Sequence, residues 1–270
     1  MSLLFTITLF SRSKILRTLR ELFLSELVRI VEKKPVPSDA IVVQGLPDVG
    51  LVGLIATAHI VSQFDLQEIA YVDSNLLPPI VVLHNGLPHS PLRIFANKKL
   101  IAMISEMPIE ANAVQPITQA LVNWVESKKA RITISIGGMP IPDRQNIKDP
   151  KVFGAASNAF ALKILQEKGV DILKEGYMVG PQALIMRYCA EKNLPAIALL
   201  AQSFYNYPDP EAATVAIKEL TNITGLKIDV SELLEKGEEI RLKARDIMKR
   251  TQHEMTRMKK AREYDLPLYV

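Results

Sequence analysis

The chain has 270 residues, of which 48% are hydrophobic and 23% charged, which supplies a full core and excludes an intrinsically disordered protein. A single cysteine excludes a disulfide scaffold, and with only four histidines we expect no metal or other cofactor and a reducing, cytoplasmic location. The net charge of +4 comes from residues 12–34 and 231–263, because the rest of the chain holds 16 Lys/Arg against 19 Asp/Glu. That distribution excludes a broadly basic nucleic-acid-binding surface.

The first 34 residues form an N-terminal extension that has two interpretations. Residues 1–10 are apolar but lack the features of a secretory signal, and they are too short to span a bilayer. Residues 15–30 repeat apolar side chains at helical spacing between arginines and glutamates, which is typical of an amphipathic helix on a membrane or a partner. We favour the alternative, a translation start placed too early, with the natural protein beginning near Leu27 or Val28.

Residues 35–230 are predicted to form one α/β domain in which strands alternate with helices. Strands are expected at 41–44, 69–72, 80–83, 92–96, 100–104, 132–136 and 196–201. Helices are expected at 48–61, 112–124, 155–166, 179–191 and 209–223. Asp48 and Asn112 are suitable N-caps, and the double glycine 137–138 is expected to end a strand. Helices on both faces of a mostly parallel or mixed sheet would give a three-layer α/β/α body.

Residues 231–263 are predicted to form a long charged helix, followed by a short extended tail at 264–270. Apolar, small and polar residues recur along it every three or four positions, as in the seam of a weak coiled coil. The seam consists of Leu233, Gly237, Ile240, Ala244, Ile247, Thr251, Met255 and Met258. About 33 residues at 1.5 Å each would make a rod of roughly 50 Å. Its charge density favours a helix that projects from the body over one packed along it.

Residue types used in catalysis occur in the body without forming a convincing active site. Segment 45–53 joins a strand to a helix, but it has neither a phosphate-binding glycine pattern nor a lysine. We expect its glycines to permit a tight turn and close packing, and Asp48 to cap the helix. Ser105 lacks the surroundings of a nucleophile elbow, and Cys189 is expected in the core.

Two further polar groups are candidates for ligand binding. His84 and His89 flank a Gly-Leu-Pro turn, but the sequence places no carboxylate cluster beside them to complete a metal site. The polar loop after the double glycine is expected to be solvated. It contains Asp143, Arg144, Asp149 and Lys151.

The last three residues are Leu268, Tyr269 and Val270, so an apolar residue and a tyrosine precede the final residue and its free carboxylate. An apolar-Tyr ending should occur by chance in roughly 1–2% of chains. Pro267 stops the preceding helix and leaves a short extended tail. This ending resembles the HbYX tail by which proteasome activators and assembly chaperones dock between subunits of the proteasome α-ring.

Several segments of the body resemble the signature segments of the archaeal homologues of proteasome assembly chaperone two. They are residues 45–53, 77–82, 105–109, 136–140, 180–184 and 209–213. The positions that we expect to be structural are Gly45, Pro47, Asp48, Gly50, Gly53, Pro78, Pro79, Glu106, Pro108, Gly137, Gly138 and Pro140. The resemblance covers about residues 35–240. With its long C-terminal helix and its ending, the chain is similar to the homologue B group of that family.

The resemblance implies a non-catalytic, ATP-independent protein that assembles into a homo-oligomer of four or five subunits. Leu268 and Tyr269 would fill a pocket of the 20S proteasome α-ring, and the carboxylate of Val270 would pair with a lysine of that pocket. The implied partners are α-subunits and further copies of the chain, with no nucleic acid and no membrane. Both assembly of α-rings and gate opening of a finished ring remain open.

An enzyme is the alternative function. Layered α/β folds of this kind resemble nucleoside phosphorylases and hydrolases, so a small-molecule site near Asp48 or Ser105 is the competing hypothesis.

Overall fold

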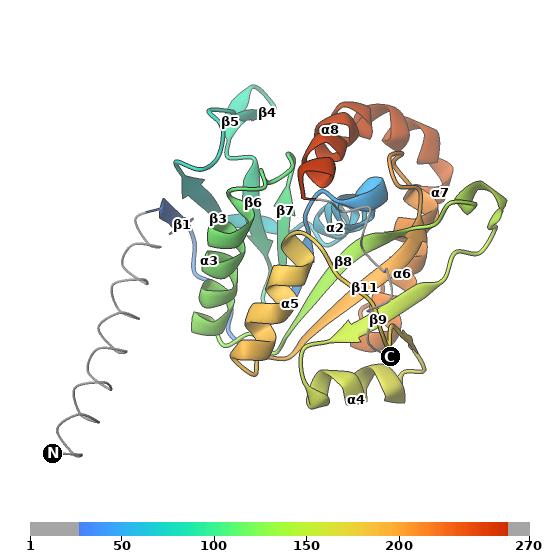
Figure 1. The fold of residues 1–270 in the computed structure, drawn as a ribbon. Coiled ribbons are helices and arrows are strands. Elements are labelled where there is room, and N and C mark those ends of the chain that lie inside the picture. The colour runs from blue at the N-terminus through green and yellow to red at the C-terminus, as the bar shows by residue number, and fades with distance from the viewer. Residues whose placement is uncertain (1–26, 259–270) are drawn as a thin grey trace, which may run out of the picture.

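A mixed sheet runs through the centre of the protein (Figure 1); the computed structural model describes residues 27–258. Within these residues the sheet has nine strands. In spatial order they are β1 (Val28–Glu32), β3 (Gln67–Ser74), β6 (Leu92–Ala96), β7 (Leu100–Ser105), β2 (Ile41–Gly45), β8 (Ile132–Pro140), β11 (Ala196–Ser203), β9 (Val152–Ala156) and β10 (Asp171–Ile172). The central strands β7, β2, β8 and β11 are parallel, whereas β1, β3 and β6 form an antiparallel extension beside β7.

Helices cover both faces of this sheet, so the predicted three-layer α/β/α architecture is confirmed. One face carries α3 (Val114–Ser127) and α5 (Pro181–Glu191). The other carries α2 (Val52–Gln63), α4 (Ala159–Glu167), α6 (Pro210–Thr224), α7 (Ser231–Glu235) and α8 (Gly237–Arg257). Among the described residues, none of these helices is long and apolar enough to cross a membrane.

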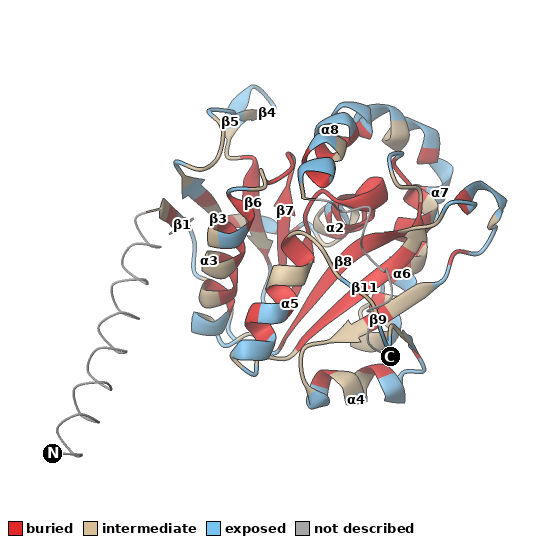
Figure 2. Ribbon diagram, viewed as in Figure 1, coloured by how far each residue is buried: buried red, intermediate tan, exposed pale blue. Residues whose placement is uncertain are grey.

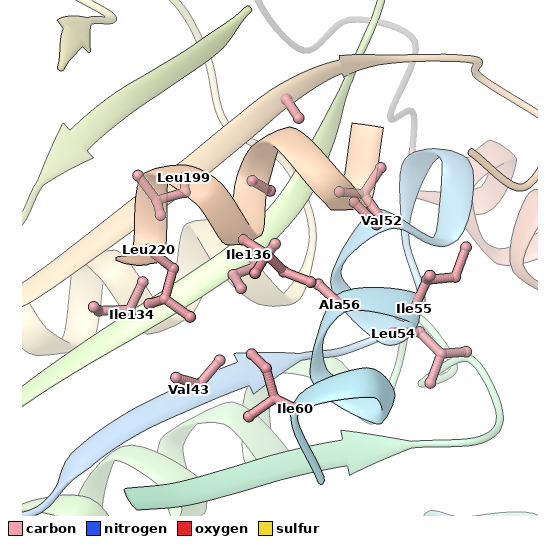
Figure 3. Packing of buried hydrophobic residues seen from close by; sticks show 14 of the residues in the cluster. Val43, Val52, Leu54, Ile55, Ala56, Ile60, Ile134, Ile136, Leu199 and Leu220 are labelled. Carbon is pink, nitrogen blue, oxygen red and sulfur yellow. The ribbon is translucent and has the colours of Figure 1, made fainter. Parts of the chain in front are cut away.

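Each face of the sheet has its own hydrophobic core, because successive side chains of a strand point to opposite faces. Val42 belongs to one core and its neighbour Val43 to the other, and both are fully buried. The buried residues concentrate along the central strands (Figure 2). Figure 3 shows Ile136 of β8 beside Ala56 of α2, and Ile134 of β8 beside Leu220 of α6. This burial on both faces explains the almost continuous apolar runs of the central strands.

Three predicted boundaries were wrong. The segment predicted as a helix from Ala155 begins in strand β9, and α4 starts only after Asn158, whose side chain accepts a hydrogen bond from Ala161 N. The strand predicted to end at the double glycine continues to Pro140, since β11 pairs with it over this length. Helix α3 begins at Val114 without the expected cap from Asn112.

The segment predicted as strand 80–83 forms no part of the central sheet. Its last residues begin β4 (Val82–His84), which pairs only with β5 (Leu87–His89) in a separate hairpin. The turn of this hairpin places Asn85 and Gly86 at φ 52° and 78°, which is typical of the tight turns that match strand twist. The hairpin stands out from the body (Figure 1).

The C-terminal helix packs along the body, which corrects the expectation of a projecting rod. It is broken at Lys236 into α7 and α8, and residues 259–263 of the predicted helix lie outside the described residues. Seam residues that are buried in the core over α2 and α6 are Leu233, Ala244, Thr251 and Met255, with Ile240 and Ile247 half-buried beside them. A seam of small and apolar residues fits a protein core as well as a second helix, and here the core covers it.

We expect Met248→Ala to lower the free energy of unfolding by about 2–5 kcal/mol, since Met248 is 3% exposed and belongs to the core beneath α8. The matched control is Leu242→Ala on the same helix, where the side chain is 69% exposed and the change should be within about 0.5 kcal/mol. Urea unfolding of both variants provides the measurement. Equal effects at the two positions would contradict the packed arrangement of α8.

Candidate functional site

Although segment 77–82 leads into the hairpin, most of the segments that resemble family signatures come together at one edge of the sheet. Because the central strands are parallel, their carboxyl ends meet there: β2 ends at Gly45, β7 at Ser105, β8 at Pro140 and β11 at Ser203. In open α/β sheets this is the edge where ligands bind. The contacts at this edge therefore distinguish a ligand site from a packing motif.

Glycines at the end of β2, in the first turn of α2 and near the end of β8 let the helix lie directly against the strand backbones. A Cβ atom on Gly53 would lie 2.2 Å from the carbonyl oxygen of Ile136, and one on Gly45 would lie 2.0 Å from that of Gly53. A Cβ on Gly138 would lie 2.4 Å from the carbonyl oxygen of Val49. Any larger residue would push the helix away from the sheet, so packing alone requires glycine at these positions.

The turn that leads into α2 is buried and strained. Gly50 and Leu51 have φ values of 60° and 52°, a left-handed conformation that costs a leucine about 1–3 kcal/mol. A Cβ on Gly50 would lie 1.9 Å from the hydroxyl oxygen of Ser203, and the carbonyl of Gly50 accepts a hydrogen bond from Asp209 N at 2.9 Å. The Leu51 side chain is fully buried, which offsets the strain.

The expected N-cap at Asp48 was wrong. The N-cap of α2 is Leu51, and Asp48 makes no capping hydrogen bond with its side chain to the 3-10 turn η1 (Val49–Leu51). Asp48 is 3% exposed, and the neighbouring turn is packed against Ser203. A phosphate needs open N–H groups at a helix N-terminus, so this geometry favours a packing role for the segment.

The two candidate nucleophiles are also held in the interior. Ser105 is 1% exposed, and its hydroxyl donates a hydrogen bond to the carbonyl oxygen of Met107 at 2.6 Å. Cys189 is 1% exposed, and burial raises the pKa of its thiol to about 12. A thiol with that pKa carries almost no thiolate at neutral pH, so Cys189 acts as a core residue.

A buried ion pair ties the polar loop after β8 to α6. Arg144 was expected in solvent but is buried in this pair. Its Nε and a guanidinium NH2 group donate hydrogen bonds to the Asp209 carboxylate at 2.8 and 3.0 Å. Burial raises the pKa of Asp209, while the N–H of Ala212 and the charge of Arg144 stabilise its ionised form. The remaining polar residues of the loop, Asp143, Asp149 and Lys151, are exposed as expected.

A network of charges connects the hairpin with the antiparallel half of the sheet. Its centre is Arg93 of β6, which is only 7% exposed and contacts both Glu106 and Glu68. Glu68 also accepts a hydrogen bond from Lys33 at 2.5 Å. These pairs join four separate segments, and the two glutamates also contact the hairpin, so the network holds the hairpin in place on the sheet.

Each histidine of the hairpin has a carboxylate partner that the sequence did not reveal. His84 Nε2 lies 2.9 Å from Glu106, and His89 Nδ1 lies 3.0 Å from Glu68. The two rings meet edge-on with centroids 5.6 Å apart. The part of the chain described by the structure contains no group of three or more His, Cys, Asp or Glu that could hold a metal ion. The pairing therefore gives the histidines a structural role at the base of the hairpin.

A groove of about 590 Å³ lies between α2, α8 and the ends of β6 and β7. Its lining is mostly apolar and includes Leu54, Ala58, Phe95, Ile104, Ile240 and Ile247. Charged and polar side chains stand at its rim, among them His59, Lys236 and Lys243. Neither the groove nor the hairpin was expected from the sequence; the signal available was the uncharged stretch 74–92.

The proposed binding residues Leu268, Tyr269 and Val270 lie outside the described residues.

The protein has an α/β/α fold, and its candidate catalytic residues Asp48, Ser105 and Cys189 are buried. The PAC2 family model matches residues 42–248, and the chain therefore belongs to the PAC2 family. This confirms the family membership indicated by the signature segments. An uncharacterized protein of Methanocaldococcus jannaschii is 26% identical over 244 residues, covering 90% of this chain and 98% of that relative.

Two solved structures from Pyrococcus furiosus have the same fold. PbaA, described as an archaeal homolog of proteasome-assembly chaperone, is 30% identical with a TM-score of 0.78, covering 84% of this chain and 98% of PbaA. PbaB, described as an archaeal proteasome activator, is 22% identical with a TM-score of 0.71, covering 82% of this chain and 99% of PbaB. The first similarity supports common family membership, and the second shows a shared fold.

Gly53→Ala should lower the free energy of unfolding by about 2 kcal/mol or more, because the new methyl group meets a backbone oxygen that cannot move alone. Gly237→Ala is the matched control at the start of α8, where a Cβ would meet nothing within 4 Å. There stability should stay constant or rise by up to about 1 kcal/mol. Thermal and urea unfolding compare the two, and a tolerated Gly53→Ala would contradict the packing role.

The pKa of Glu68 predicts a contribution to acid stability. Burial alone would raise this pKa, but hydrogen bonds from Lys33 and His89 and the charges of Lys33 and Arg93 together lower it below 4.5. The stabilisation is therefore complete above about pH 4.5 and is lost as the pH falls through the lowered pKa. Glu68→Gln should be less stable than the parent at pH 7, with the difference shrinking below pH 4.5.

Unfolding followed from pH 7 to pH 3 measures this difference. Glu167→Gln is the control, since it removes only an exposed pair with Lys163 and should leave the pH profile of the parent unchanged. A difference between Glu68→Gln and the parent that stays constant down to pH 3 would refute the pKa argument.

Proposed function

We propose that this chain is an ATP-independent proteasome assembly chaperone or activator that binds the α-ring of the 20S proteasome through its C-terminal tail. The observation that carries the proposal is PAC2 family membership together with 30% identity to PbaA, a proteasome-assembly-chaperone homolog. The apolar-Tyr ending at Leu268 and Tyr269 supplies a binding element of the right chemistry. The protein acts by binding, without catalysis, in the cytoplasm.

The tail combines two modes of recognition in three residues. Tyr269 presents an apolar ring with a polar tip, and Leu268 adds an apolar contact, so both suit a pocket between subunits. The free carboxylate of Val270 suits a lysine or backbone N–H groups at the base of such a pocket. One tail of this size should bind with a dissociation constant of about μM to mM. Several tails on one homo-oligomer of four or five subunits would raise the avidity by about 10²–10⁴.

The packing of α8 determines where each tail starts. Glu254 near the end of α8 accepts a hydrogen bond from Ala111 N at 2.9 Å, which fixes this end beside the segment before α3. The 12 residues from 259 to 270 span at most about 40 Å when fully extended. The reach to the α-ring comes from this segment and from the arrangement of subunits, since α8 itself lies on the body.

We expect Tyr269→Ala to weaken binding to the α-ring of the natural proteasome by at least about 30-fold, as loss of a buried aromatic anchor costs about 2 kcal/mol or more. Tyr264→Ala is the matched control, because it removes a tyrosine of the same tail outside the motif and should bind as the parent does. Surface plasmon resonance with immobilised α-rings measures both. A deletion of residues 268–270 should abolish binding.

Two readouts separate the roles. Faster peptide hydrolysis by finished 20S particles would indicate gate opening, and faster ring formation from free α-subunits would indicate assembly. Binding that survives the deletion of residues 268–270 would move the interface to the α/β body, and no binding by the parent would overturn the proposal.

A further inference from the structure

The hairpin β4–β5 presents an uncharged apolar surface to solvent. We call residues 80–89 the finger. No Asp, Glu, Lys or Arg occurs between Ser74 and Leu92, although 23% of the whole chain is charged. Such depletion of charge is characteristic of the centres of protein interfaces.

The exposed apolar side chains of the protein concentrate on this finger. Ile80, Val81, Leu83 and Leu87 are 38%, 62%, 66% and 63% exposed, and they make up four of the nine large exposed hydrophobic residues in the described part of the chain. Four such residues within an eight-residue segment form a cluster rather than the scattered exposure common on protein surfaces. The finger stands away from the helices (Figure 2), and within residues 27–258 the side chains of Val81, Leu83 and Leu87 remain more than half exposed.

The finger is preformed for binding. A two-stranded hairpin is marginally stable by itself, but this one has a tight Asn85-Gly86 turn and a fixed base. His84 lies 2.9 Å from Glu106 and His89 lies 3.0 Å from Glu68, one on each strand of the hairpin. A segment held in one conformation loses little entropy on association, so its apolar area contributes more fully to affinity.

The same chain carries a complementary surface that its own finger leaves open. The groove between α2 and α8 is mostly apolar and has about 590 Å³ of free space, yet the finger contributes only His84 to its lining. Ala58 on α2 is exposed at this groove, and Ile240 and Ile247 are half-buried there. An uncharged finger can enter between the lysines and glutamates of the rim without leaving a buried charge unpaired.

We propose that the finger of one copy of this chain inserts into the α2–α8 groove of the next copy. This contact joins two different surfaces, so repetition around one axis produces a ring of subunits when the rotation closes and an open filament when it does not. A second copy is the occupant because a single chain supplies both halves: an uncharged projection and a mostly apolar groove, in which the charges of Arg93 and Glu106 are already paired with each other. The inference deepens the proposed function and rests on the homo-oligomer that the proposed function requires.

Two variants break opposite sides of the contact. The finger variant combines Leu83→Lys with Leu87→Lys, and the groove variant is Ala58→Arg; all three positions are exposed, so the fold should persist. Leu242→Lys is the matched control, with 69% exposure on the outer face of α8 away from the groove. Circular dichroism verifies the fold, and light scattering after size-exclusion chromatography gives the mass.

We expect the finger variant and the groove variant each to run as monomers, and the control to run as the parent oligomer. An equimolar mixture of the two variants should form dimers and nothing larger, because it contains one intact finger and one intact groove for each pair. A symmetric finger-to-finger contact would leave the groove variant oligomeric by itself, because its finger is intact, and this result would overturn the proposal. Parent-sized oligomers from either variant alone, or a monomeric parent, would overturn it as well.

Deletion of residues 268–270 separates this inference from the proposed function. The truncated protein should form the same oligomer as the parent but should no longer bind α-rings. If the finger and groove variants stay oligomeric and the deletion still abolishes ring binding, the inference fails and the proposed function stands. If those variants become monomeric and the deletion leaves ring binding intact, the finger contact stands and tail docking fails.

Discussion

The direct contact between the backbone of α2 and the strands β2 and β8 determines how the turn before α2, the start of α6 and helix α8 pack at the sheet edge. With no side chain on Gly45, Gly53 or Gly138, the helix approaches until carbonyl oxygens of one element lie where Cβ atoms would otherwise be. That approach brings the carbonyl of Gly50 within 2.9 Å of Asp209 N, which joins the turn before α2 to the start of α6. Helix α8 then packs over the closed surface, so an edge that is open in many α/β enzymes is filled by protein.

A closed edge moves the accessible features to the antiparallel half of the sheet. There Arg93 is buried between Glu68 and Glu106. A buried arginine is tolerated because the two carboxylates compensate its positive charge. The two histidines of the hairpin attach to the same carboxylates. Charges thus lie at the base of the hairpin while its exposed tip is uncharged, and the proposed finger contact rests on this arrangement.

The sequence predicted the central strands well because burial on both faces leaves a run of apolar residues such as Val42 and Val43. It missed β9 because glycine and alanine within it weaken the strand pattern. The helical spacing of residues 237–257 predicted a helix but not its partner, since the same seam fits a core or a second helix. The pairs His84–Glu106 and His89–Glu68 join residues more than 20 positions apart, so no local pattern could reveal them. The glycine packing was inferable, whereas the groove depends on where α8 lies.

The symmetry of the proposed assembly would link the proposed finger contact to the proposed docking of the tail. A weak C-terminal anchor is effective only when several tails reach one α-ring together, and this requires every tail to leave the same face of the oligomer. Rotation of subunits about a single axis satisfies the requirement, because Ala111 and Glu254 then hold the end of α8 at the same height in every copy. A dihedral assembly would turn half of the α8 ends to the opposite face and reduce the number of tails that one ring can engage. The proposed head-to-tail contact of finger and groove would generate this single-axis arrangement when its rotation closes, so in the proposed assembly the same contact would also set how many tails can reach one α-ring.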